Sequence, residues 1–329
     1  MADAPDLGSG PREGVGVQVS SSAPTRPATG THFDLVRLRF SFTALDAIHF
    51  PANCAANLLR GAFGLALESG DAGCLFAPRS PATLSDRVAG SWNIAGPPEA
   101  ACRPAKGGPS GLADLPRPFV FRARHLDGLT IRSGERFHFD LHLFTSRPDA
   151  LDAVRRAFAA VASTGIGPGR GRAEMDEPSV EPVSLSLDPL PSAPSRIHVD
   201  FLTPTELKHQ GRIVTEPLFP VLFARTRDRI STLRELYGPG PLSLDFAAIG
   251  ARAAAVRMVA CDWSPVEITR RSSRTGQSHG IGGFTGFAEY EGPLVEFLPY
   301  LEAARWTGVG RQAVWGKGEI AVSPSTIEA

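Results

Sequence analysis

TGIGPGRGRAEM, residues 164–175, is followed 143 residues later by TGVGRQAVWGKGEI, residues 307–320. Both copies begin with Thr, Gly, an aliphatic residue and Gly, and both follow a stretch of apolar residues at helical spacing. Similarity at a fixed interval within one chain indicates duplication of a structural unit. We therefore expect two related domains.

The residues before the first copy predict a strand, a helix, two strands and a helix. Residues 33–43 alternate apolar and polar side chains, as in a half-buried strand, and helical spacing follows over 52–69. Residues 118–125 and 134–145 predict a hairpin, and the apolar positions of 151–161 predict the second helix. A strand-like stretch after the glycines completes the order β-α-β-β-α-β.

The second half repeats this order. Residues 197–203 predict a strand, 219–237 a helix, 265–273 and 282–292 the arms of a hairpin, and 297–306 a short helix. Two β-α-β-β-α-β units predict an α+β protein of tandem ferredoxin-like (RRM-like) domains with a C-terminal glycine-rich loop. The boundaries we expect are a disordered tail at 1–31, an N-terminal domain at 32–190 with an insertion at about 71–115, and a C-terminal domain at 191–329 with its glycine-rich loop at 307–318.

Charge and cysteine content narrow the class of protein. The 34 Lys and Arg residues balance 34 Asp and Glu residues, so the net charge gives no global nucleic-acid signal. Only three of the basic residues are lysines, and arginine suits phosphate and stacked bases better than lysine does. The four cysteines match no paired zinc motif, and no apolar run suggests a signal peptide or a spanning helix. We expect a cytoplasmic protein without a structural zinc site and without a membrane-spanning helix.

Two segments carry a resemblance to a known family. LLRGAFG (58–64) and the long segment from GGFTGFAEYEG to WGKGEIAV (282–322) resemble the RAMP superfamily of CRISPR-associated proteins, specifically its repeat-RNA (pre-crRNA) processing endoribonucleases. The resemblance spans about residues 33–323.

The resemblance implies a metal-independent endoribonuclease without a cofactor, which cleaves precursor CRISPR RNA within its repeats to give crRNA. Attack by the neighbouring 2′-hydroxyl would leave a 2′,3′-cyclic phosphate and a 5′-hydroxyl. Repeat RNA or crRNA is then the partner, together with other Cas effector subunits. Two alternatives stay open: a non-catalytic RAMP subunit that binds crRNA in an effector complex, and a metabolic α+β enzyme with a pocket between its domains.

The chemistry needs a proton donor or acceptor and cations for the phosphate charge. His49, between the first strand and the first helix, is where the resemblance places a catalytic histidine, and His279 is the alternative. His138, Asp140 and His142 alternate on one strand, which suits a solvated polar face better than a metal site. The residues expected to bind RNA are Arg37, Arg39, Arg270, Arg271, Arg274, Gly308, Gly310, Arg311, Gly316, Lys317 and Gly318.

Overall fold

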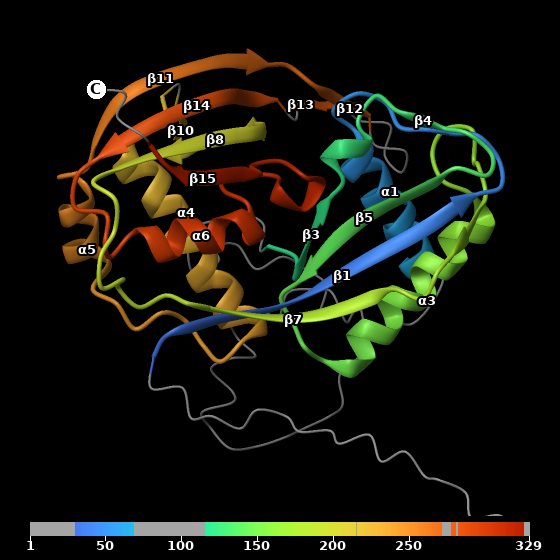
Figure 1. Cartoon of the computed structure of the whole chain (residues 1–329), viewed down its shortest axis with the longest axis horizontal. Helices are drawn as coiled ribbons and strands as arrows, with labels where there is room; N and C mark the ends of the chain where they lie inside the picture. Colours follow the sequence, from blue (N-terminus) through green and yellow to red (C-terminus); the bar gives the residue numbers. More distant parts are fainter. Residues whose placement is uncertain (1–29, 69–115, 215, 272–277, 281, 326–329) are drawn as a thin grey trace, which may run out of the picture.

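The computed structural model describes residues 30–68, 116–214, 216–271, 278–280 and 282–325. Figure 1 shows two main β-sheets, one in each half of the chain, and each has helices packed against one face. No helix in these ranges is long and apolar enough to cross a membrane. The expected tail and insertion lie almost entirely outside the described residues.

The first unit follows the predicted order, with short extra strands. Its sheet has the order β3-β5-β1-β6, with β7 also paired to β1, and every neighbour in it is antiparallel. This is the strand order of a ferredoxin-like unit. The elements are β1 (His32–Ala44), β2 (Ile48–His49), α1 (Ala55–Glu68), β3 (Phe119–Arg122), β4 (Thr130–Ile131), β5 (Arg136–Leu143), α3 (Pro148–Thr164), β6 (Ala173–Met175) and β7 (Ser179–Ser186).

Alternation along β1 decides which face of the first sheet is covered. Leu38, Phe40 and Phe42 are fully buried under α1 and α3, because successive side chains of a strand point to opposite faces. Phe158 of α3 stacks into the same aromatic cluster, with its ring 4.6 Å from that of Phe40. Arg37 therefore lies on the opposite, open face of the sheet.

The second unit repeats the topology of the first. Its sheet has the order β11-β14-β8-β15, which is the same spatial arrangement of second, third, first and fourth strands. The tandem ferredoxin-like α+β fold is thereby confirmed. The elements are β8 (Arg196–Thr205), β9 (Lys208–His209), β10 (Arg212–Ile213), α4 (Phe219–Tyr237), α5 (Phe246–Ala253), β11 (Arg257–Val266), β12 (Thr269–Arg271), β13 (Ser278–Gly280), β14 (Gly283–Glu291), α6 (Leu298–Thr307) and β15 (Ile320–Pro324).

Two elements of the second unit differ from the sequence-based expectation. Helix α5 was not predicted; its N-terminus is capped by Asp245, whose carboxylate accepts from the amides of Ala247 and Ala248. Strand β11 begins at Arg257, well before the predicted hairpin arm at 265. As an edge strand it is mostly exposed on both faces, so it lacks the burial alternation that marks β1.

Part of the first unit belongs to the apolar core of the second unit. Phe33, Leu35 and Val120 of the first unit join the apolar cluster formed by α4 and α6 of the second. In Figure 1, α6 lies beneath β15 with its C-terminal end directed toward β3. At this end, the face of the first sheet opposite α1 and α3 therefore packs against the second unit, which brings the loop after α6 to the first unit.

Candidate functional site

The residues 45–56 connect β1 to α1 and lie between the two glycine-rich loops. The first loop contacts this connection at its β2 end: a Cβ added to Gly167 would lie 3.1 Å from the carbonyl oxygen of His49. The second loop contacts it at the start of α1, where a Cβ on Gly316 would overlap the side chain of Ala56. We refer to residues 45–56 as the bracketed segment.

His49, the histidine predicted to be catalytic, lies in the bracketed segment. It lies on β2, which pairs with β4, and its side chain is exposed. Its Nδ1 lies 3.0 Å from the hydroxyl oxygen of Thr130, which fixes the orientation of the ring. No partner is found for the other ring nitrogen among the described residues, so Nε2 is open to a ligand.

The second glycine-rich loop turns sharply at four glycines that all have positive φ: Gly308, Gly310, Gly316 and Gly318. Glycine adopts this conformation without the steric cost of a Cβ. At Gly310 a Cβ would overlap the carbonyl oxygen of Glu206, and at Gly318 that of Val309. The close approaches found here are therefore to the protein's own backbone, and a contact of these glycines with RNA stays a prediction.

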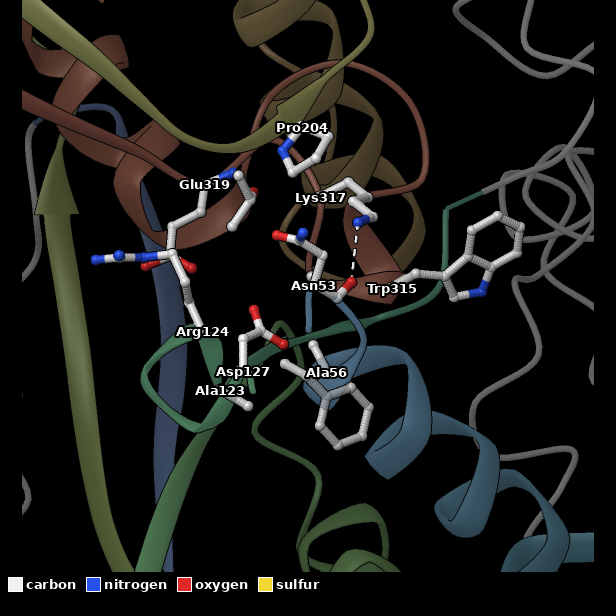
Figure 2. A pocket seen from close by; sticks show the side chains of 12 residues that line it. Asn53, Ala56, Ala123, Arg124, Asp127, Pro204, Trp315, Lys317 and Glu319 are labelled. Atoms are coloured by element: carbon white, nitrogen blue, oxygen red, sulfur yellow. Dashed lines mark hydrogen bonds between the residues drawn. The ribbon is translucent and has the colours of Figure 1, made fainter. Parts of the chain in front are cut away.

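Lys317 lies at the interface of the two units. Lys317 is only 3% exposed. Its Nζ donates a hydrogen bond of 3.3 Å to the carbonyl oxygen of Asn53 (Figure 2). Asn53 has a φ of 57°. Burial lowers the pKa of Lys317. Direct contact of this ammonium with RNA would require the loop to move.

Lys317 and Asp127 line a small pocket between the units (Figure 2). Burial raises the pKa of Asp127, and its carboxylate accepts a hydrogen bond of 2.8 Å from the amide of Ala55 at the start of α1. The cavity has a volume of about 10 Å³, which is space for about one water molecule. The pocket therefore joins the second loop to α1 and is too small for a substrate.

The C-terminal end of α6 positions the second loop. Arg122 of β3 donates to the carbonyl oxygens of Arg305 and Trp306, and His142 Nδ1 donates to that of Trp306 at 3.0 Å. Arg229 of α4 donates to the Thr307 carbonyl at 2.9 Å. Cationic donors at a helix C-terminus satisfy the last carbonyls and complement the helix dipole. Two strands of the first unit thus hold the helix immediately before the loop.

Arg37 and Arg39 lie on the open face of the first sheet, as the alternation predicts, but both are paired. Each donates to Asp140, at 2.8 Å and 2.7 Å. Burial acts to raise the pKa of Asp140, but the hydrogen bonds from Arg39 and Arg37 outweigh it and the pKa is lowered. Any RNA contact at these two arginines would compete with this carboxylate.

The structure places the remaining predicted residues as follows. Arg311 forms an ion pair with Glu206. The backbones of Arg270 and His279 lie opposite each other where β12 pairs with β13, on a ribbon that extends the hairpin of β11 and β14. Arg271 is on the same ribbon, and Arg274 lies outside the described residues. No group of three or more His, Cys, Asp or Glu residues in the described ranges could hold a metal ion.

Sequence reasoning did not single out Asp127, Asn53 or Arg170 as parts of this region. Asp127 and Asn53 reach it through contacts between distant segments, which no local pattern indicates. Arg170 did have a signal, because it stands within the repeated glycine-rich motif that indicated the duplication.

Comparison with known proteins agrees with this architecture. Residues 199–320 match the family described as CRISPR-associated endoribonuclease Cas6, and 33–187 match a family described as an N-terminal domain. A Cas6 product complex from Thermus thermophilus is similar in structure, with a TM-score of 0.51 and 14% identity over 88% of this chain and 100% of that one. A partial Cas6-RT-Cas1–Cas2 complex has a TM-score of 0.55 and 11% identity over 90% of this chain and 47% of that one. No curated protein matches the sequence.

The fold is the one found in Cas6 proteins of solved structure. More narrowly, residues 199–320 match the Cas6 family, and the resemblance inferred from the glycine-rich segments is confirmed.

Proposed function

We propose that this protein is an endoribonuclease that cleaves precursor CRISPR RNA within its repeats, in the cytoplasm and without a metal ion. The observation that carries the proposal is the placement of His49, an exposed histidine on a segment bracketed by both glycine-rich loops. Cas6 membership of residues 199–320 supports RNA processing as the general role.

The proposed reaction uses the RNA's own 2′-hydroxyl as nucleophile. A base removes the 2′ proton, O2′ bonds to phosphorus, and the bond from phosphorus to O5′ breaks as O5′ takes up a proton. The products are a 2′,3′-cyclic phosphate and a 5′-hydroxyl. The imidazole of His49, held by Thr130 and free at Nε2, serves as base or acid in this sequence.

The RNA is proposed to run over the open polar surfaces of both units. Paired arginines exchange a carboxylate for a phosphate at modest cost when they are solvent-exposed. The residues proposed to contact RNA are Arg37, Arg39, Arg270, Arg271, Arg274, Gly308, Gly310, Arg311, Gly316, Lys317 and Gly318, with His279 as the alternative catalytic histidine. Cas proteins are proposed as further partners, because a structural neighbour is part of a Cas6-RT-Cas1–Cas2 complex.

The test is cleavage of end-labelled repeat RNA under single-turnover conditions in EDTA. We expect cleavage by the wild type and a loss of about 10²- to 10⁴-fold in His49→Ala, the range for removal of a general acid or base, with little change in RNA affinity. His198→Ala is the matched control, because His198 is engaged with Asp200 and Glu289 on the second sheet. Thr130→Val should cause a smaller loss than His49→Ala.

Each alternative has its own outcome in this experiment. Repeat binding without cleavage would identify a crRNA-binding subunit and contradict the proposal. Cleavage that stops in EDTA would contradict the mechanism, and an unchanged rate in His49→Ala would move the catalytic role to another histidine.

A further inference from the structure

Arg170 has a backbone conformation that arginine rarely adopts. In the first glycine-rich loop its φ is 47°, in the left-handed region, although glycines flank it on both sides. A residue other than glycine is strained in such a conformation, and strain of this kind is concentrated at functional sites. Glycine or asparagine would fold here at lower cost, so an arginine at this position suggests a role for its side chain.

The charge of Arg170 is also uncompensated. Arg170 is exposed, and it forms no ion pair or side-chain hydrogen bond with any residue in the described ranges. Arg172, two residues further on, is held by Asp46 with an N···O distance of 2.8 Å. The same loop therefore contains one arginine that is bound to a carboxylate and one that is free to bind an anion.

The loop that carries Arg170 packs against the backbone of the strand that carries His49. The amide of Arg170 donates 3.1 Å to the carbonyl oxygen of Gly167, which closes a turn, and Gly167 packs on the backbone of His49. The loop is closed again where Ile166 and Gly171 exchange hydrogen bonds of 2.8 and 3.1 Å. Gly171 packs against Ala47 and Ile48. The backbone of Arg170 is thus held between two glycines, Gly167 and Gly171, that both contact the segment that carries His49.

In the second glycine-rich loop, the corresponding cation, Lys317, is already bound to another part of the protein. The second loop is closed by a bond of 2.8 Å from the amide of Val309 to the carbonyl of Gly318, as the first is by Ile166 and Gly171. Lys317 therefore corresponds to Arg170: each precedes the closing glycine. Lys317 is buried against Asn53, so Arg170 is the one of this pair that a ligand can reach.

We infer that Arg170 binds the RNA phosphate on which His49 acts. The inference rests on the proposed function. A guanidinium offers two parallel donors to phosphate oxygens, and its fixed charge stabilises the additional negative charge that develops on phosphorus as O2′ attacks. The strained turn holds it in place before RNA arrives.

The test compares Arg170→Asn with Arg172→Asn, because asparagine tolerates the left-handed conformation and both variants lose one charge from the same loop. Binding of repeat RNA is measured at several salt concentrations, using a substrate with a 2′-deoxy nucleotide at the cleavage site. Arg170→Asn should reduce the slope of log affinity against log salt by about 0.7, the value for one phosphate on a single strand. It should also slow single-turnover cleavage of the unmodified RNA by about 10²-fold.

Arg172→Asn should change neither quantity by more than about twofold, and Arg170→Lys should retain most of the slope. An Arg170→Asn variant with the slope and rate of Arg172→Asn would overturn the inference. A reduced slope with an unchanged rate would place Arg170 on another phosphate, and a reduced rate with an unchanged slope would exclude phosphate binding; both contradict it. A wild type that binds without cleaving would refute the proposed function instead, and the slope alone would then decide whether Arg170 binds phosphate.

Discussion

At the scale of single residues, Gly310 shows how tightly the second loop packs on its own unit. A Cβ there would overlap the Glu206 carbonyl oxygen, and φ is 72°. Gly310→Ala should therefore lower the free energy of unfolding by about 1 to 3 kcal/mol, as measured by urea denaturation. Gly169→Ala in the first loop is the control, because nothing lies within 4 Å of its added Cβ. Equal stability of the two variants would contradict this packing.

At the scale of elements, the hydrogen bond that holds the C-terminal end of α6 depends on the protonation state of His142. Burial lowers its pKa from 6.5 to about 3, and the neutral ring donates to the Trp306 carbonyl. Between these two values the unfolded chain binds more protons than the folded one, so stability falls as the pH falls through this window. From pH 6.5 to 5 the loss should be about 2 kcal/mol. His142→Asn keeps a donor without the titration, and its unfolding free energy should change less over this range.

An equal pH dependence in the wild type and in His142→Asn would contradict the lowered pKa. Carboxylates also titrate near the acid end of the window, so the comparison is made above pH 5, where the difference between the two proteins reports His142 alone.

At the scale of the whole molecule, basic residues are abundant but largely compensated. The net charge is zero, and ion pairs hold Arg37, Arg39 and Arg311. RNA affinity should therefore depend on a few cations. Arg311→Ala should weaken repeat binding and reduce the salt slope by about 0.7 if it contacts one phosphate. Arg252 lies on helix α5 and forms an ion pair with Glu296. Arg252→Ala breaks this pair and should leave the slope unchanged. Equal slopes in both variants would remove Arg311 from the interface.

The sequence alone determined the features that repeat locally. Alternation along 33–43, helical spacing over 219–237 and the duplicated glycines predicted the elements, and the duplication predicted two units of one topology. Helix α5 and the first part of strand β11 were not predicted, because a short helix and an exposed edge strand have weak hydrophobic periodicity. His49 was proposed from the family resemblance, which places a histidine between the first strand and the first helix, and its catalytic role stays a prediction.

Only the tertiary structure decided which polar groups meet. Arg122 and His142 come from different strands and converge on α6, more than 160 residues away along the chain. Lys317 is 264 residues from Asn53 along the chain, and burial between the units gives its ammonium an interdomain hydrogen bond that no local pattern indicated. Sequence periodicity reports which face of an element is apolar. It does not report how two units dock, because docking depends on the summed packing of surfaces built from separate segments.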